Sequence, residues 1–162
     1  MSVNKYQPHL LVIPEDDANR DIFTGFLNHR SVNSRRVHVE NVAGGWTDAL
    51  DLLINEHARG MRRYDKRHVL ILIDFDRREN RFEQVWTKIP KDLRNRVFIM
   101  GCQDEPERVR DATGLTKEQL GEALAKACVS GEAGLWDNPI LAHNLPELER
   151  MRMTICPALL ES

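Results

Sequence analysis

Residues 69–76 read VLILIDFD, in which five consecutive apolar residues run directly into two acids separated by one residue. A short apolar run that ends at charged residues is typical of a β-strand buried on both faces, as in the interior of a parallel sheet. Residues 10–13 (LLVI) precede a proline and three acids, and residues 97–100 (VFIM) precede a glycine, so both repeat the pattern. Residues 36–42 alternate apolar and polar side chains, which predicts a strand nearer the edge of the sheet.

Helical periodicity fills the gaps between these strands. Apolar residues recur at helical spacing in residues 17–29, 46–57 and 82–89. The resulting order, β-α-β-α-β-α-β, predicts an α/β fold with right-handed crossovers, namely a Rossmann-like parallel sheet of about four strands with flanking helices. Residues 104–162 contain helix signals but no fifth strand. We therefore expect a single domain over residues 1–162, with a helical C-terminal extension.

Three helix starts are marked in this last third of the chain. Residues 104–107 (DEPE) place a proline early in a helix, and Thr116 with Gln119 has the spacing of a capping box. Asn144 is expected to cap the final helix, with Glu147 reaching back to the cap.

The composition excludes several classes of protein. The 162 residues include 23 Lys and Arg against 25 Asp and Glu, for a formal net charge of −2, which excludes a basic field over the whole surface but not a local basic groove. The three cysteines are far apart and form no CxxC pair, so neither a zinc ribbon nor a disulfide framework is indicated. We see no signal peptide and no apolar run approaching the roughly 18–20 residues of a membrane span. We therefore expect a cytoplasmic protein without a membrane segment.

Acidic residues follow two of the predicted strands. Glu15, Asp16 and Asp17 follow the first, and Asp74 and Asp76 follow the third. Ligands of open parallel sheets bind at the carboxyl ends of the strands, so these carboxylates converge if the two strands are neighbours. Mg²⁺ would relieve their repulsion, and two acids spaced i, i+2 on an extended backbone can face one metal. The alternative is that Asp16 or Asp17 caps the first helix and Asp76 caps a turn.

One family resemblance covers the first half of the chain. Residues 11–20 (LVIPEDDANR) resemble the opening of a response-regulator receiver domain, and residues 45–50 (GWTDAL) resemble its second βα unit. This resemblance implies that Asp74 is a phosphoacceptor. However, a receiver has Ser or Thr where this chain has Gly101 and Cys102, and it has a fifth strand ending in Lys that we do not find here. A receiver also has no counterpart of Asp76, the second acid of the D-x-D. The corresponding hypothesis is a receiver-like signalling or protein-interaction module without catalysis.

The same acids resemble those of Toprim domains, which occur in topoisomerases, primases and OLD-type nucleases. Toprim domains carry a glutamate after strand one and a D-x-D after strand three, which Glu15, Asp74 and Asp76 match. Residues 44–45 (GG) resemble the glycine-containing turn that follows the second strand there. This Toprim-like resemblance covers about residues 9–101 and leaves the helical remainder unexplained.

The Toprim resemblance implies a Mg²⁺- or Mn²⁺-dependent phosphoryl transfer of nuclease type on nucleic acid. Asp74 and Asp76 would hold the metal, which stabilises an in-line displacement at the phosphodiester. Glu15 would act as general acid or base or share a metal. Glu79 and Glu105 are the candidate donors to a second metal.

An acidic site that acts on a polyanion also needs local positive charge. Arg77 and Arg78 directly follow the D-x-D, and Arg20 lies on the first predicted helix, so these three are the candidate substrate-binding residues. The alternative for Arg77 and Arg78 is a salt bridge to neighbouring acids. Because one small domain offers little room for a complete substrate groove, we expect a partner protein, such as an ATPase or helicase, or a second copy of the chain.

Overall fold

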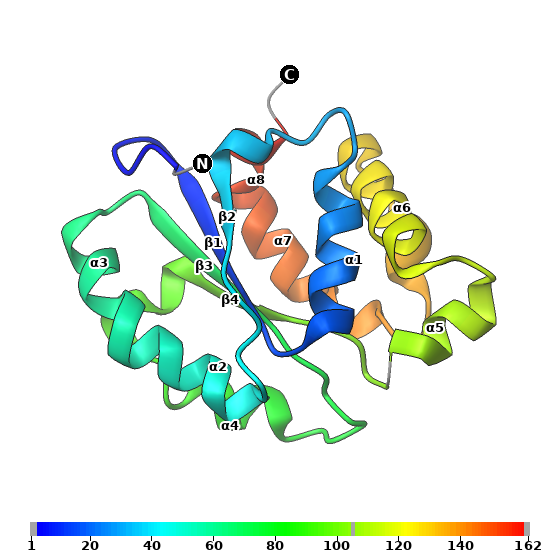
Figure 1. Ribbon diagram of the computed structural model, residues 1–162, viewed down its shortest axis with the longest axis horizontal. Coiled ribbons are helices and arrows are strands. Elements are labelled where there is room, and N and C mark those ends of the chain that lie inside the picture. The colour runs from blue at the N-terminus through cyan, green and yellow to red at the C-terminus, as the bar shows by residue number, and fades with distance from the viewer. Residues whose placement is uncertain (1–2, 105, 161–162) are drawn as a thin grey trace.

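The apolar runs of the sequence form the strands of one parallel sheet. The computed structural model describes residues 3–104 and 106–160. The strands are β1 (His9–Pro14), β2 (Val37–Val39), β3 (Arg67–Leu72) and β4 (Val97–Met100), in the order β2-β1-β3-β4 (Figure 1). The expected four-stranded α/β fold is confirmed, although β2 is shorter than the predicted edge strand. From β1 the chain crosses to β2 on one side, and from β3 it crosses to β4 on the other side. The strand order therefore reverses between β1 and β3, and ligands of such sheets bind in the crevice at the carboxyl ends of these two strands.

Helices cover both faces of this sheet (Figure 1). They are α1 (Asp17–Leu27), α2 (Trp46–Leu52), α3 (Ala58–Arg63), α4 (Arg81–Trp86), α5 (Pro106–Thr113), α6 (Lys117–Ser130), α7 (Leu145–Met153) and α8 (Cys156–Leu159). Short 3-10 turns are η1 (Ser34–Arg36), η3 (Lys91–Arg96), η4 (Gly134–Asp137) and η5 (Ala142–Asn144), and a π-helical turn, η2 (Leu53–His57), joins α2 to α3. The helix predicted over residues 46–57 therefore continues to Arg63.

Alternate side chains of the strands enter two separate cores. Leu10 and Val12 belong to the core beneath α1, α6, α7 and α8, whereas Leu11 and Ile13 belong to the core beneath α2, α3 and α4. This alternation explains why the strands read as continuous apolar runs in the sequence. Because the chain after residue 105 supplies more than half of the buried residues of the first core, the C-terminal extension is part of the sheet's packing.

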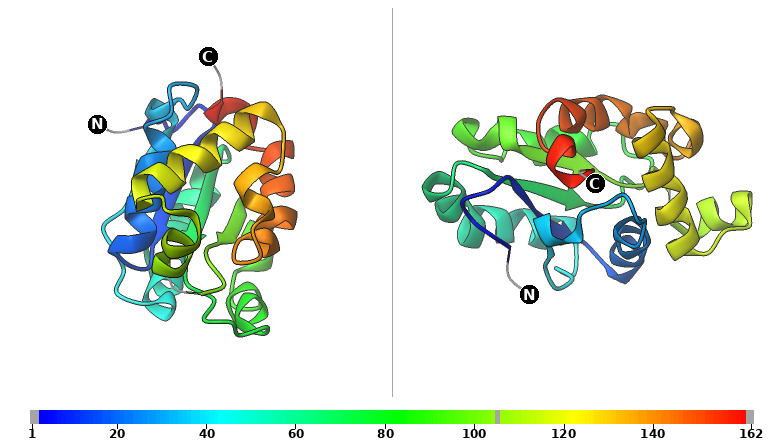
Figure 2. Two further views of the ribbon diagram at one scale, coloured as in Figure 1. Left: turned by 90° about the vertical axis from the view of Figure 1, so that its right-hand side faces the viewer. Right: turned by 90° about the horizontal axis from the view of Figure 1, so that it is seen from above.

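Helix α6 packs against α1 rather than standing apart from the fold (Figure 2). A Cβ atom at Gly121 would overlap the backbone carbonyl of Ile22, so the close approach of the two helices depends on glycine. The predicted capping box is confirmed, since the Thr116 hydroxyl accepts from the Gln119 N–H and the Gln119 side chain accepts from the Thr116 N–H. The predicted helix start near Pro106 is also confirmed.

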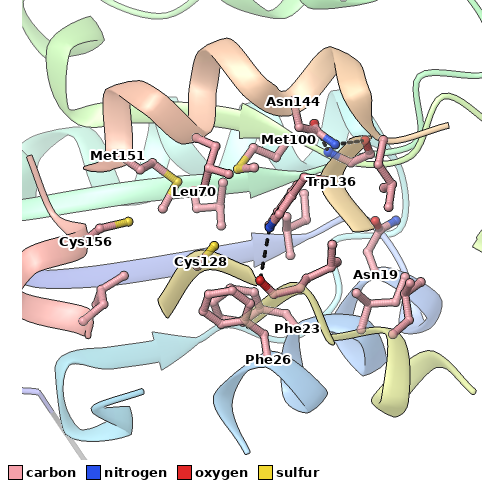
Figure 3. Close-up of a pocket in the computed structure, with 18 of the residues that line it drawn as sticks. Asn19, Phe23, Phe26, Leu70, Met100, Cys128, Trp136, Asn144, Met151 and Cys156 are labelled. Carbon is pink, nitrogen blue, oxygen red and sulfur yellow. Dashed lines mark hydrogen bonds between the residues drawn. The ribbon is translucent and has the colours of Figure 1, made fainter. Parts of the chain in front are cut away.

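A cavity of about 70 Å³ remains in the core beneath α1, α6 and α7 (Figure 3). Its lining is mainly apolar, and Trp136 is anchored there because its indole Nε1–H donates to the carbonyl oxygen of Leu124 at 3.1 Å. Asn19 is one of the few polar residues in the lining, and it also belongs to the acidic site described below.

Helix α7 covers the outer edge of β4, where a fifth strand would otherwise pair. Asn144 is the N-cap residue of α7, as predicted, but the predicted capping hydrogen bonds are wrong, because neither the Asn144 nor the Glu147 side chain caps the helix. The Asn144 side chain accepts from the Gly101 N–H at 3.0 Å and donates to the Gly101 carbonyl at 2.9 Å. Glu147 Oε2 accepts from the Ile99 N–H at 2.9 Å. Side chains of α7 and of the residue that precedes it thus satisfy backbone groups that an edge strand leaves open.

Candidate metal centre

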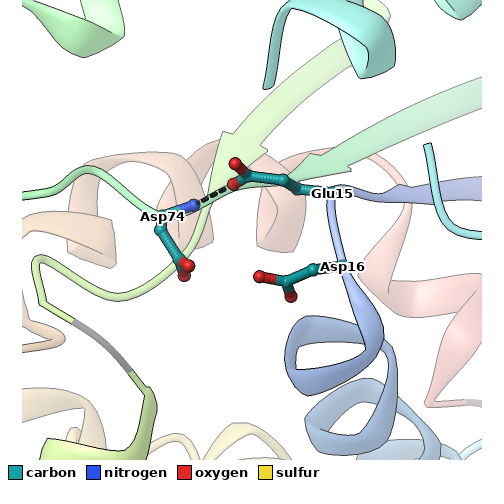
Figure 4. Close-up of side chains that lie close together, drawn as sticks. All are labelled: Glu15, Asp16 and Asp74. Carbon is teal, nitrogen blue, oxygen red and sulfur yellow. Dashed lines mark hydrogen bonds between the residues drawn. The ribbon is translucent and has the colours of Figure 1, made fainter. Parts of the chain in front are cut away.

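Three carboxylates meet at the carboxyl ends of β1 and β3 (Figure 4). Glu15, Asp16 and Asp74 each offer an oxygen, and these oxygens all lie within 4.8 Å of one another. Glu15 directly continues β1, since its N–H donates to the carbonyl of Leu72 at 2.8 Å. Its Oε2 accepts from the Asp74 N–H at 2.6 Å, which ties the two strand ends together. The predicted convergence of the first and third strands is therefore confirmed.

Asp16 has two roles in this structure. It is the N-cap of α1, with its Oδ1 accepting from the Asn19 N–H at 2.9 Å, so the capping alternative is confirmed for this residue. The Asn19 amide also donates to Asp16 Oδ1 at 2.9 Å and to Asp74 Oδ1 at 3.2 Å. Asn19 is 3% exposed and was not identified from the sequence. The available signal was a polar amide three residues after the N-cap, which by itself does not indicate a site.

Each of the three carboxylates keeps one oxygen free. Protein hydrogen bonds occupy Glu15 Oε2, Asp16 Oδ1 and Asp74 Oδ1. Within the described part of the chain, the second oxygen of each group accepts no hydrogen bond, and no Lys, Arg or His side chain forms an ion pair with any of the three. Half-buried negative charge is thus gathered without a paired basic side chain among the described residues, in the oxygen-rich setting that Mg²⁺ prefers.

The electrostatic cost of this arrangement falls mainly on Asp74. Burial, and then the nearby charge of Asp16, raises the pKa of Asp74 to about 7, although the hydrogen bond from Asn19 opposes the change. Burial also raises the pKa of Glu15, against the opposing hydrogen bond from the Asp74 N–H. Both carboxyl groups would bind a divalent cation in competition with protons.

Asp76 does not join the group of three. Asp76 and Arg77 have φ angles of +52° and +54°, so the chain leaves the extended conformation that was predicted for the D-x-D. The Asp76 carboxylate is 53% exposed and lies 3.3 Å from Nη1 of Arg81. Its charge is still close enough to raise the pKa of Glu15 and of Asp74. Its role as a metal ligand stays a prediction.

Arg81 is a second residue that the sequence did not reveal. It begins α4 and is only 6% exposed, with its guanidinium 4.7 Å from the centre of the Trp46 ring. Besides Asp76, its Nη1 contacts the carbonyl oxygen of Asp74 at 3.2 Å. Among the described residues its buried Nε has no hydrogen-bond partner. Arg81 therefore supports the loop behind the carboxylates and supplies the buried positive charge nearest to them.

The predicted arginines lie outside the carboxylate group. Arg20 pairs with Asp17 at 2.9 Å, and Arg77 pairs with Asp104 at 2.7 Å. Arg77 therefore forms a salt bridge, but its partner is Asp104 on the far side of β4 in the sequence and not an acid adjacent to it. Arg78 is exposed and forms no ion pair with any residue that the structure describes.

The remaining candidates contribute little to this geometry. Glu79 is exposed in the loop before α4, and Glu105 lies outside the described residues. Cys102 follows β4 and is 3% exposed, and burial raises the pKa of its thiol to about 12. The thiol is therefore protonated and poorly suited to act as a nucleophile.

Comparison of the chain with protein-family models, with curated proteins and with solved structures gave no match. None of the helices over residues 3–104 and 106–160 is long and apolar enough to cross a membrane.

Proposed function

We propose that the protein binds Mg²⁺ or Mn²⁺ through Glu15, Asp16 and Asp74 and performs phosphoryl transfer of nuclease type on nucleic acid. The supporting observation is the set of three converging carboxylates, each with one oxygen unused by the protein. Mg²⁺ takes six oxygen ligands and usually retains several waters. Three protein oxygens leave positions for water and for one substrate phosphate.

The bound metal would neutralise a phosphodiester and stabilise the charge that develops during an in-line displacement. Glu15 is suited to the accompanying proton transfer, because burial raises its pKa above that of an ordinary glutamate. Its Oε2 is held by the Asp74 N–H, so Oε1 would either coordinate the metal or carry the proton, and in the second case Asp16 and Asp74 would hold the metal. Asn19 would keep Asp16 and Asp74 in fixed orientations.

The substrate would need more positive charge than this chain alone provides near the site. Arg20 and Arg77 are engaged by neighbouring acids, which leaves Arg78 as the predicted substrate-binding arginine that is free in the described structure. We therefore include a partner protein, such as an ATPase, or a second copy of the chain in the proposal. The three buried, free cysteines are consistent with a cytoplasmic setting for such a complex.

A receiver-like module is the second candidate, and one observation favours it. Asp16, which lies within the segment that resembles a receiver, completes the carboxylate group in place of Asp76. In this alternative, a small phosphodonor transfers its phosphoryl group to the free Oδ2 of Asp74. Cys102 is buried at the position where a receiver carries a hydroxyl, which weighs against it.

One set of variants tests both candidates. Calorimetric titration with Mg²⁺ and Mn²⁺ would compare the wild type with D74N, D16N and D76N, alongside hydrolysis assays on single- and double-stranded DNA and RNA. The nuclease-type proposal expects metal-dependent hydrolysis that both D74N and D16N abolish, whereas D76N, which lies outside the group of three, should still bind the metal. If the wild type binds metal but hydrolyses no nucleic acid, and mass spectrometry finds a phosphoryl group on Asp74, the receiver-like module replaces it. A wild type that binds neither metal excludes both and leaves an interaction module.

A further inference from the structure

The amino ends of the strands carry basic side chains, in contrast to the acids at the carboxyl ends. The three segments directly before β2, β3 and β4 each finish with two arginines, which are Arg35 and Arg36 in η1, Arg62 and Arg63 in α3, and Arg94 and Arg96 in η3. Residues 59–67 (RGMRRYDKR) contain five basic residues and one acid. Positive charge is therefore concentrated at the end of the sheet opposite the carboxylate group.

Several of these arginines have structural partners. Arg62 pairs with Asp92 at 2.9 Å. Arg96 donates to the carbonyls of Tyr64 and Arg67, at 3.2 and 2.8 Å. Cations at the C-terminal end of a helix are also favoured by the helix dipole. Neither reason accounts for the cations from two separate segments that gather around Tyr64.

Three cations surround the ring of Tyr64. Lys5 Nζ lies 5.3 Å from the ring centre, and the guanidinium carbons of Arg63 and Arg67 lie 5.5 and 5.1 Å from it. Lys5 precedes β1, whereas the two arginines lie at the end of α3 and the start of β3. The register of His9 with Arg67 brings the two segments together (Figure 1). Within the described part of the chain, none of the three cations forms an ion pair with a carboxylate.

An exposed aromatic ring adjoins these cations. Tyr6 is 75% exposed, and its ring meets the Tyr64 ring edge to face, with the ring centres 5.9 Å apart. A turn holds Tyr6 in place, because the Asn4 side chain accepts from the Tyr6 N–H at 3.0 Å and the Asn4 carbonyl accepts from the Gln7 N–H at 3.2 Å. We call the group of Lys5, Tyr6, Arg63, Tyr64 and Arg67 the Tyr64 cluster.

A buried histidine orients the most enclosed of the cations. His9 is 1% exposed, and its Nδ1 lies 2.8 Å from the carbonyl oxygen of Gln7, so this nitrogen carries the proton. Its Nε2 then accepts from Nε of Arg67 at 3.0 Å. The Nη atoms of Arg67 donate no hydrogen bond within residues 3–104 and 106–160, which leaves one edge of the guanidinium for a phosphate.

We propose that the Tyr64 cluster binds single-stranded nucleic acid, with phosphates on the cations and a base stacked on Tyr6. Unpaired cations beside a fixed aromatic ring are the combination that recognises single strands, since the charges follow the backbone and the ring stacks on unpaired bases. An acidic protein or an anionic membrane would match the charge but offers no base to the exposed ring.

This surface is separate from the carboxylate group. β3 has six residues, so at a rise of about 3.3 Å per residue the two ends of the strand lie roughly 20 Å apart. Binding at the Tyr64 cluster requires neither a metal nor hydrolysis. The inference therefore stands or falls independently of the proposed phosphoryl transfer.

The test uses the full chain in the D74N background and in EDTA, so that neither metal nor hydrolysis contributes. Fluorescence anisotropy would measure the binding of labelled oligo(dT) and oligo(U) over a range of salt concentrations. K5Q/R63Q should reduce the slope of log K against log salt by about 1.4, or about 0.7 per phosphate contact, and weaken binding about 25-fold at 0.1 M salt. R110Q/K126Q removes the same charges from exposed positions on α5 and α6 and should bind like the parent.

A second pair of variants tests the stacking. Y6A should weaken binding by about 5-fold or more, whereas Y6F keeps the ring and should bind like the parent. Circular dichroism would confirm that each variant is folded. If the parent binds neither oligonucleotide, or if K5Q/R63Q binds as tightly as R110Q/K126Q, the Tyr64 cluster is not a nucleic-acid surface. Equal binding by Y6A and Y6F, or tighter binding of duplex than of single strands, would overturn the assignment to single strands.

Two other partners would be recognised by the same variants. If the chain self-associates in sedimentation runs without nucleic acid and K5Q/R63Q abolishes the association, the cluster is an interface between copies. If vesicles of phosphatidylcholine and phosphatidylserine bind the parent but not K5Q/R63Q, and the oligonucleotides do not bind, the partner is a membrane. Either result would replace the proposal, and neither would affect Mg²⁺ binding at the three carboxylates.

Discussion

Two regions of this molecule hold buried acids in opposite ways. Glu147 on α7 is 5% exposed, and both of its oxygens have partners, the Ile99 N–H at 2.9 Å and Arg150 Nη1 at 2.6 Å. At the ends of β1 and β3, Glu15, Asp16 and Asp74 share one region without an ion-pair partner in the described structure. The first arrangement satisfies its charge within the protein, and the second does not.

This difference separates a structural acid from a candidate binding site. Arg150 also donates to the carbonyls of Arg94 and Val97, at 2.7 and 3.1 Å, so the Glu147–Arg150 pair links α7 to the segment around β4. Removing one member of such a buried pair destabilises the fold, because the other member is left as an uncompensated charge. Carboxylates that gather without a cation destabilise the fold by their presence, which is the pattern expected where an external cation binds.

The largest predicted effect is at the structural acid. E147A leaves the Ile99 N–H and the Arg150 charge without their partner, so we expect it to lower the free energy of unfolding by about 3–5 kcal/mol. Urea denaturation measures this loss. E149A is the matched control, because Glu149 is 66% exposed and lies 3.8 Å from Arg152, and it should change stability by less than about 0.5 kcal/mol. Equal losses in the two variants would contradict the structural role.

The next effect comes from the metal. At a Mg²⁺ concentration of 100 times the dissociation constant, the free energy of unfolding should rise by about 2.7 kcal/mol. Thermal denaturation with and without EDTA measures this increment. E147Q should retain the full increment despite its lower stability, whereas D16N should lose it. An increment that survives in D16N would show that the metal does not bind at the three carboxylates.

A smaller effect of the opposite sign is expected at Asp74. In metal-free protein at pH 8, D74N removes one charge from a repelling group while keeping the acceptor for Asn19, so it should raise the free energy of unfolding by about 1–2 kcal/mol. The same variant should lose the Mg²⁺ increment. D111N, at an exposed aspartate, should be neutral. A metal-free D74N that is less stable than the wild type would show that Asp74 acts as a structural acid.

The sheet and the meeting point of the acids were predictable from the sequence because they depend on short-range patterns. The apolar runs at residues 10–13, 69–73 and 97–100 set strands with both faces buried, and parallel topology brings their carboxyl ends together. The docking of α7 was not predictable in the same way. Asn144 and Glu147 have the residue types of a helix cap, and only the packed structure shows them bonded to Gly101, directly after β4, and to Ile99 on β4.

The membership of the candidate site was predicted less completely. Asp16 has the signal of an N-cap, which does not reveal that its carboxylate meets those of Glu15 and Asp74. The i, i+2 argument for Asp76 assumed extended backbone, but the positive φ at that residue turns it toward Arg81. Asn19 joins the site only through tertiary contacts, which periodicity and motif spacing do not encode.

The smallest predicted effect is a pH dependence that the metal reverses. The folded pKa of Asp74, about 7, lies above the ordinary aspartate value of 3.8, so the folded state holds the proton more tightly. The stability of metal-free wild type relative to D74N should therefore fall as pH rises from about 4 to about 7, by less than about 1 kcal/mol per pH unit, and level off above that range. Denaturation curves of both proteins in EDTA measure this difference, and the contribution of the histidines cancels because both proteins contain the same ones.

With Mg²⁺ present, the rise in the free energy of unfolding that the metal produces should grow over the same pH range, because the metal binds the deprotonated carboxylates. Parallel slopes with and without Mg²⁺ would mean that Asp74 titrates independently of the metal, and the contrast with the paired acid on α7 would then rest on charge repulsion alone.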